Sequence, residues 1–76
     1  MSYTYLQRNK MFCKGKYGEY SKFEDAQAAC TEDSNCVAVY DNKCDGGTFH
    51  LCPKKHYYRS SASSCIFAKT IQGKIF

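Results

Sequence analysis

The sequence predicts a small α+β domain, rich in disulfides, that comprises one helix and several short strands. Three observations support this prediction. Six cysteines occur in only 76 residues, the segment at about residues 22–32 has the pattern of a capped amphipathic helix, and the flanking segments alternate β-rich runs with turn residues. No linker or shift in composition divides the chain, so residues 1–76 are expected to form a single domain.

The cysteines are expected to form three disulfides in an oxidising, extracellular compartment. A chain of this length buries only about 60% of the surface of its unfolded state, so its core alone supplies little stability. The number of cysteines is even, and none are spaced in the close pairs that structural zinc sites use. We therefore expect a secreted protein with no metal site and no cofactor. No apolar run approaches the ~20 residues of a membrane-spanning helix, so no membrane span is expected.

The residues before the helix predict an extended strand followed by a turn. Tyr5 and the apolar run Met11–Cys13 favour an edge strand. Gly15 and Gly18 flank Tyr17, and glycines at this spacing are typical of a turn or loop.

The helix itself is predicted from its start signal and from its periodicity. Ser21 is expected to be the N-cap, and Glu24 follows three residues later, as in a capping box. Turn residues beginning at Asp33 should end the helix near Glu32. The predicted apolar face has the spacing i, i+3, i+6 and i+7, and consists of Phe23, Ala26, Ala29 and Cys30.

Three further strands are expected after the helix. The β-rich run Cys36–Tyr40 predicts a central strand, residues 41–47 a turn, and Thr48–Cys52 a returning strand. Residues 54–64 are expected to form a polar loop, and Cys65–Lys69 another strand.

The returning strand contains a conflict in its alternation. Its apolar residues Phe49 and Leu51 fall on one face, and His50 and Cys52 fall on the other. If Cys52 points at the helix, then either the strand bulges near Pro53 or both faces of the sheet are covered.

Sequence alone does not choose among the possible disulfide pairings. Cys36 and Cys44 flank an expected hairpin, and Cys30 on the helix needs a partner on a strand. Cys13 and Cys65 lie near the two ends of the chain. One nested set satisfies these three considerations: Cys13–Cys65, Cys30–Cys52 and Cys36–Cys44.

The segment EYSKFEDAQAACTEDSNCVAVYD, residues 19–41, resembles the core of a PAN/apple domain, which has a capped helix with one cysteine, a second cysteine just past its end, and then a strand. The runs FHLC and SCIF, at residues 49–52 and 64–67, resemble the closing strands of that family. The likeness extends over about residues 12–69. It implies an antiparallel sheet curled around one central helix, the nested pairing given above, and a module that binds proteins or carbohydrates.

Catalysis is not expected. His50 and His56 are the only histidines, an even cysteine count argues against a free nucleophilic thiol, and the serines at residues 60–64 lack a G-x-S-x-G motif. The spacing of Asp41 and Asp45 is similar to the start of an EF-hand loop, but a cysteine stands at the last ligand position. We interpret this segment as a turn.

The ligand-contacting face is expected on the loops. Residues 54–59 combine cations, which can hold anionic groups, with tyrosine rings, which can stack on sugars or peptide groups. A solvated loop with one tyrosine in the core is the alternative interpretation of this segment. The predicted contact residues are Lys54, Lys55, Tyr57, Tyr58 and Arg59, with Asp41, Asn42 and Asp45 as polar candidates nearby.

These features favour a secreted, non-enzymatic recognition module of adhesion type, which binds a glycan as a lectin does or binds an extracellular protein. Self-association as a homo-oligomer would give it avidity. One alternative is a small cationic toxin or antimicrobial peptide, although seven acidic residues are interleaved with the cations. Another is a structural or adhesive matrix protein, with which seven tyrosines are consistent. Nucleic acid is not an expected partner, because a net charge of +4 provides no basic stripe.

Overall fold

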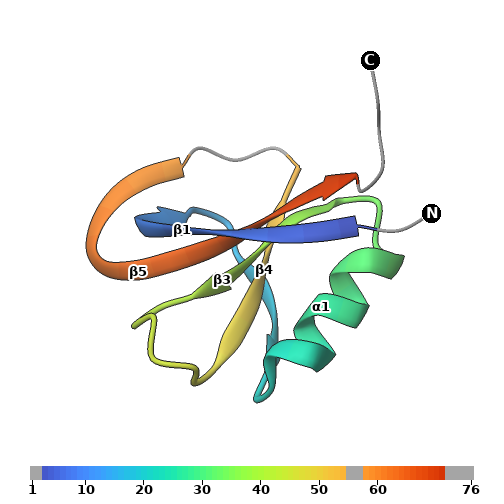
Figure 1. Cartoon of the computed structure of the whole chain (residues 1–76), viewed down its shortest axis with the longest axis horizontal. Helices are drawn as coiled ribbons and strands as arrows, with labels where there is room; N and C mark the ends of the chain where they lie inside the picture. Colours follow the sequence, from blue (N-terminus) through green and yellow to red (C-terminus); the bar gives the residue numbers. More distant parts are fainter. Residues whose placement is uncertain (1–2, 55–57, 72–76) are drawn as a thin grey trace.

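A computed structural model describes the backbone of residues 3–54 and 58–71, and the side chains of residues 3–54 and 63–70. Within these residues one helix packs against a five-stranded antiparallel sheet (Figure 1). The chain is therefore a small disulfide-rich α+β protein, as predicted. Its elements are β1 (Tyr3–Cys13), β2 (Tyr17–Tyr20), α1 (Phe23–Glu32), β3 (Cys36–Asp41), β4 (Phe49–Pro53) and β5 (Tyr58–Ile71).

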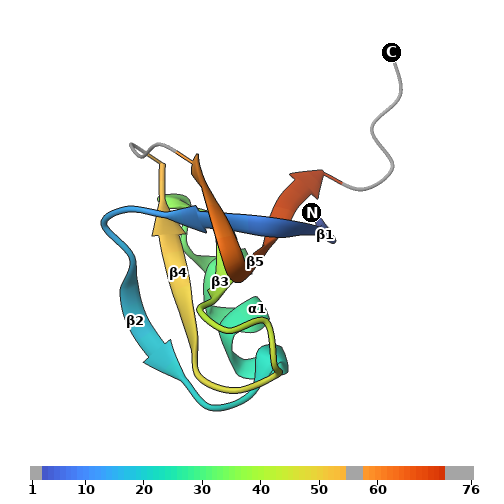
Figure 2. The ribbon, with the colours of Figure 1, turned by 90° about the vertical axis from the view of Figure 1, so that its left-hand side faces the viewer.

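The strands are arranged in the order β1-β5-β3-β4-β2, and every neighbouring pair is antiparallel. The predictions that β1 is an edge strand and that β3 is central are confirmed. The opposite edge is β2, which the glycines at positions 15 and 18 had indicated to be a turn. Figure 2 shows β2 alongside β4, with which it pairs at Tyr17 and Tyr20.

The last strand is longer than predicted. Residues 58–64 were expected to be loop, but they belong to β5 and extend the pairing with β1. This is possible because the register shifts where β1 passes from Asn9 to Met11, and Lys10 adopts a positive φ of 62° there. Such an irregularity bends a strand. The bend of β5 is visible in Figure 1.

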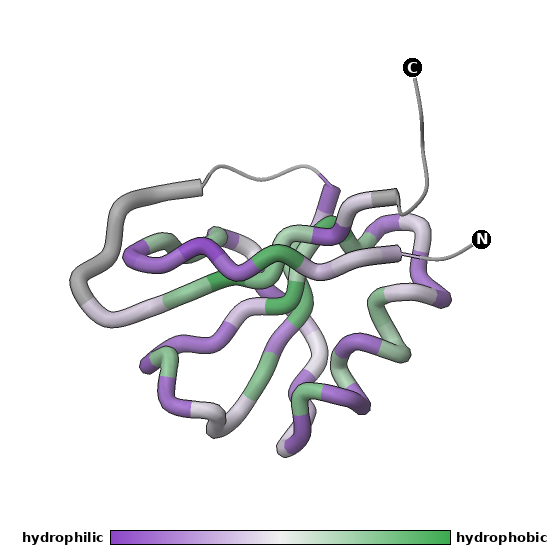
Figure 3. The backbone as a smooth tube through the Cα atoms, in the orientation of Figure 1, coloured by the Kyte–Doolittle hydropathy of each residue, from purple (hydrophilic) through white to green (hydrophobic). Residues whose placement is uncertain are grey.

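Both faces of the sheet are covered, which resolves the conflict in β4. Phe49 and Leu51 pack in the cluster that contains the buried helix residues Ala26 and Cys30. Cys52 belongs to a second cluster on the other face. The register between β3 and β4 also shifts beside Pro53, so the bulge occurs as well. Figure 3 shows hydrophobic stretches of the backbone near the middle of the view, where the central strands run.

The three disulfides differ from the nested set that sequence reasoning favoured and that the PAN/apple resemblance implied. The predicted pairs Cys13–Cys65, Cys30–Cys52 and Cys36–Cys44 are all wrong. The pairs present are Cys13–Cys52, Cys30–Cys36 and Cys44–Cys65, with Cα separations of 6.0, 5.1 and 5.1 Å.

Strand geometry explains the observed pairing. Cys36 begins β3 and Cys44 lies beyond its end, and a strand rises by ~3.3 Å per residue, so β3 holds them apart. Cys30 in the last turn of α1 meets Cys36 instead, because the chain turns back immediately after the helix. Cys52 faces away from the helix, and Cys13 is the cysteine found on that face.

The helix has the predicted bounds and apolar face but not the predicted cap. It begins at Phe23 and ends at Glu32, with Ala26 and Cys30 buried. Its N-cap residue is Lys22, and no side chain caps the first turn. Ser21 lies one position too early to be the N-cap, so the capping box with Glu24 does not form.

Candidate functional site

Two small cavities meet at the loop between β3 and β4, and Asp41 lines both of them. The polar cavity has a volume of about 210 Å³ and is lined by Asp41, Asn42, Lys43, Asp45, Gly47 and Thr48. The apolar cavity has a volume of about 290 Å³ and is lined by Gln7, Phe23, Asp41, Cys44, Gly46, Phe49, Cys65 and Phe67. We refer to them below as the polar cavity and the apolar cavity.

Alternation along β3 places Asp41 on the helix side of the sheet. Val39, two residues earlier, packs in the cluster beneath α1, and residues i and i+2 of a strand share a face. The cross-strand neighbours of Asp41 are Phe49 on β4 and Cys65 on β5. As a result Asp41 is only 2% exposed, which is unusual for a carboxylate.

The β3–β4 loop supplies one hydrogen bond to the Asp41 carboxylate. The backbone N–H of Gly46 donates to Oδ2 at 2.9 Å. Gly46 has a φ of 78°, a conformation that glycine adopts without strain. The disulfide from Cys44 to Cys65 ties this loop to β5. The other oxygen, Oδ1 of Asp41, is buried, and no donor within the described part of the chain reaches it.

Asn42 and Asp45 of the loop have hydrogen-bond partners. The Tyr40 hydroxyl donates to Oδ1 of Asn42 at 2.7 Å, and the Ser64 hydroxyl donates to the Asn42 carbonyl oxygen at 2.7 Å. Oδ1 of Asp45 accepts from the N–H of Gly47 at 2.9 Å. These bonds fix the loop, and they leave Oδ1 of Asp41 as the buried side-chain oxygen without a partner among the described residues.

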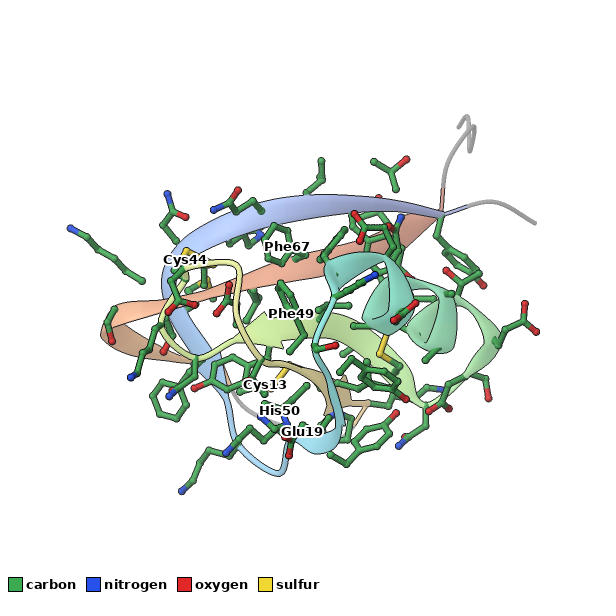
Figure 4. All side chains as sticks on the ribbon, turned by 90° about the horizontal axis from the view of Figure 1, so that it is seen from below. Cys13, Glu19, Cys44, Phe49, His50 and Phe67 are labelled. Carbon is green, nitrogen blue, oxygen red and sulfur yellow. A yellow bond between two sulfur atoms is a disulfide. The ribbon has the colours of Figure 1, made fainter. Side chains whose placement is uncertain are left out.

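Three phenylalanines form much of the apolar cavity. The Phe23 ring from the start of α1 lies 4.7 Å from the Phe67 ring and 5.7 Å from the Phe49 ring, measured between centroids. Figure 4 shows Phe49 and Phe67 in the interior of the molecule, with Cys44 on the adjacent loop. Helix, sheet and loop thus each contribute one side of the cavity.

The structure brings together only one of the two predicted groups of contact residues. Asp41, at the end of β3, and Asn42 and Asp45, in the loop that follows, all line the polar cavity. Lys54 is exposed and follows the far end of β4, so the length of that strand separates it from the cavities.

The rest of the predicted basic and aromatic group is described only in part. Lys55 and Tyr57 lie outside the described residues. Tyr58 and Arg59 begin β5, where their backbone pairs with Cys13 and Phe12 of β1, but their side chains are outside the described set. The prediction that these side chains contact a ligand therefore stays a prediction.

Sequence reasoning did not find that Phe23, Phe49 and Phe67 together line the apolar cavity (the aromatic wall of the site). Phe23 was assigned to the apolar face of the helix, and Phe49 to a strand, without a sign that the two meet beside Asp41. Only the register of β3 with β4 and β5 makes Phe49, Phe67 and Asp41 neighbours. The sequence holds no local motif that encodes this register.

The metal-ligating residue types are dispersed over the part of the chain that the structure describes. Among residues 3–54 and 58–71 no group of three or more His, Cys, Asp or Glu side chains is placed to hold a metal ion. Nδ1 of His50 instead lies 2.6 Å from the carbonyl oxygen of Gly18 and links β4 to β2. The described segments also contain no helix with the length and apolar character needed to cross a membrane.

No family model, no curated protein and no solved structure matches the chain.

Proposed function

We propose that this protein is an extracellular, non-catalytic recognition module of adhesion type, whose glycan or protein ligand contacts the β3–β4 loop. The observation that carries this proposal is the pair of adjoining cavities that share Asp41. A small apolar cavity with a few placed polar groups beside it is the usual composition of a binding site. Three disulfides in so short a chain support an oxidising, extracellular setting.

The polar cavity supports the glycan form of the proposal. Its lining offers carboxylate, amide, ammonium and hydroxyl groups within one loop. Sugar hydroxyls donate and accept hydrogen bonds, so a mixed set of this kind can satisfy them. The disulfide at Cys44 and the bonds to Asn42 hold the loop in place before a ligand arrives, which lowers the entropic cost of binding.

A relationship to PAN/apple domains is part of the same proposal. One helix packed on an antiparallel sheet agrees with the fold that the resemblance implies. The disulfide pairing does not agree with it. Self-association is likewise proposed, through the edge strand β1, where Leu6 is the exposed large apolar side chain among the described residues.

A glycan array probed with the labelled, oxidised chain tests the proposal. Asp45→Asn removes one negative charge from the polar cavity while its Oδ1 can still accept from Gly47. Glu32→Gln removes one negative charge from the exposed end of α1 and is the matched control. We expect binding to fall about tenfold in D45N, because a hydrogen bond to a charged group is lost, and to be unchanged in E32Q.

Two outcomes would count against this assignment. Equal binding by D45N and E32Q would place the contact face elsewhere on the molecule. Failure to bind any glycan at high protein concentration would remove the lectin form and leave recognition of a protein.

A further inference from the structure

We propose that the apolar cavity is a subsite for a protonated amine carried on an apolar stem, attracted by the Asp41 carboxylate and in contact with Phe23, Phe49 and Phe67, which line the cavity. This inference rests on the proposed function, because it assigns a ligand class to the same site. Two independent observations support it: a carboxylate that is 2% exposed has one oxygen without a partner among the described residues, and three aromatic rings lie beside it.

The incomplete hydrogen bonding of the Asp41 carboxylate indicates that the proposed ligand group is positively charged. A buried ionised group that is not paired costs several kcal/mol, and natural proteins seldom leave one without compensation. Here Gly46 satisfies only Oδ2. Oδ1 is buried, and opposite charges attract each other more strongly near the interior of a protein than in bulk water. A cation in the adjoining cavity supplies the compensation.

The aromatic rings indicate that this cation is organic. The negative face of a phenylalanine ring attracts an ammonium group, and the attraction grows when water is excluded. Apolar stems gain further free energy from contact with the rings and with the Cys44–Cys65 disulfide. A calcium ion would need 6–8 oxygen ligands, whereas Oδ1 of Asn42 and Oδ1 of Asp45 already accept hydrogen bonds within the loop.

The size of the cavity limits what can enter. A volume of about 290 Å³ lies just below the usual range for ligand sites, which begins at about 300 Å³. It suits a single alkylammonium group, such as a free amine or the end of a lysine side chain, better than a whole oligosaccharide. The shared chemistry of these two sources is a primary ammonium on a chain of methylene groups.

The charges around the site favour a cation locally, despite the net charge of +4 on the chain. The two cavities are lined by the acidic residues Asp41 and Asp45, against the single cation Lys43. The helix that starts at Phe23 has a positive N-terminal end, which the acidic residues Glu24 and Asp25 in its first turn offset.

NMR titration of the oxidised full-length chain with n-butylammonium tests the inference, with 1-butanol as the uncharged probe of matched length. For a ligand of so few atoms we expect a Kd on the order of 1 mM. Butanol should bind at least about tenfold more weakly, because it lacks the charge that Asp41 attracts.

Three variants make the test decisive. Asp41→Asn should weaken n-butylammonium binding by about tenfold or more, since the amide keeps the bond from Gly46 but not the charge. Gln7 is exposed at the rim of the cavity, so substitutions there spare the core. Q7E should tighten binding and Q7K should weaken it, each by about threefold, as expected for partly exposed charge pairs.

The inference is overturned if the amine and butanol bind equally, or if Q7E and Q7K shift the affinity in the same direction. The Gln7 pair keeps this conclusion available even if D41N does not fold. The amine titration and the glycan array can fail separately, so loss of one proposal is distinguishable from loss of the other.

A third comparison identifies the source of the amine. N-acetyl-lysine methylamide presents the same ammonium from a peptide backbone, and its norleucine counterpart lacks the charge. Binding of the lysine compound as tight as that of n-butylammonium assigns the subsite to a lysine of a protein ligand. Binding of n-butylammonium alone assigns it to a free amine.

Discussion

The two ends of the interface between α1 and the sheet differ in how fully their polar groups are hydrogen-bonded. At the C-terminal end of α1 the ammonium of Lys69 donates to the carbonyl oxygens of Cys30, Asp33 and Cys36, at 2.6, 3.2 and 3.2 Å. The Cys30–Cys36 disulfide closes the same turn. The half-buried ammonium thus adds a further donor to the carbonyls of Cys30 and Asp33, which also accept from the backbone N–H groups of Asp33 and Cys36.

At the N-terminal end of α1 the polar groups are less well satisfied. No side chain caps the first turn of the helix. Across from it, Oδ1 of Asp41 is buried without a donor among the described residues, and the two cavities open beside it. The comparison indicates that one end of the interface stabilises the fold, and that the other retains an unmet charge that a ligand can satisfy.

The disulfides at the two ends provide the largest test of this contrast. In the chain-entropy model, replacing Cys44 and Cys65 by alanine costs about 3 kcal/mol of unfolding free energy, and replacing Cys30 and Cys36 about 2 kcal/mol. Denaturant unfolding measures both. The first variant should also lose n-butylammonium binding, because the loop is released, while the second keeps it. The reverse pattern of binding would contradict the division between the two ends.

Lys69 carries the next largest expected effect. Lys69→Met keeps the apolar stem but removes the donors to three carbonyl oxygens, so the unfolding free energy should fall by about 2 kcal/mol. Lys54→Met is the control, since Lys54 is an exposed lysine on the same chain. Equal melting temperatures for the two variants would show that the ammonium of Lys69 does not hold the end of the helix.

The hydrogen bond between Tyr17 and Asp33 predicts a smaller, pH-dependent effect at the same end. The Tyr17 hydroxyl donates to Oδ2 of Asp33 at 2.5 Å, and this bond, with the Asn35 N–H, lowers the pKa of Asp33. The bond therefore stabilises the fold above the unfolded pKa of about 3.9. That stabilisation is lost as the pH falls through the lower pKa of the folded state.

Tyr17 gives the matching effect at alkaline pH. Burial, and then the bond to Asp33, raise the pKa of Tyr17 to about 12. The stabilisation is thus complete below about pH 10 and is lost as the pH rises through about 12. Melting temperatures of Y17F across this range should vary less with pH than those of the Y20F control, on the same strand. Identical profiles would contradict a role for the bond.

Ser21 provides the smallest expected effect. Because Lys22 is the N-cap and no side chain caps the helix, Ser21→Ala should change the unfolding free energy by less than about 0.5 kcal/mol. A loss near 1 kcal/mol, which is typical of removing an N-cap side chain, would show that the capping box forms after all.

The parts of the fold that depend on local patterns were predictable from the sequence. The helix bounds follow from periodicity and from the turn at Asp33, and the central position of β3 follows from its β-rich composition. β2 was not predicted because it has only four residues and contains Gly18, so its sequence lacks the pattern of a strand. It pairs with β4 at Tyr17 and Tyr20. The first half of β5 was missed because polar serines satisfy the pattern of a loop equally well.

The disulfide pairing and the aromatic wall of the site depend on register and were not predictable. The nested pairing assumed that Cys36 and Cys44 face each other across a hairpin, but Pro53 stands opposite Cys36. Asp41 was predicted as a contact residue for its polarity alone. Its burial between Phe49 and Cys65 follows from strand order, which no single segment specifies.

A chemical-shift map of the wild-type chain titrated with n-butylammonium tests the central contrast most directly. We predict that the amide signals of residues 41–47, with those of Phe49 and Phe67, move in a saturable way, and that those of residues 30–36 do not. Butanol at the same concentration should shift them clearly less, as its roughly tenfold weaker binding requires. Shifts of equal size at both ends of the interface, or the same shifts with butanol, would contradict the account.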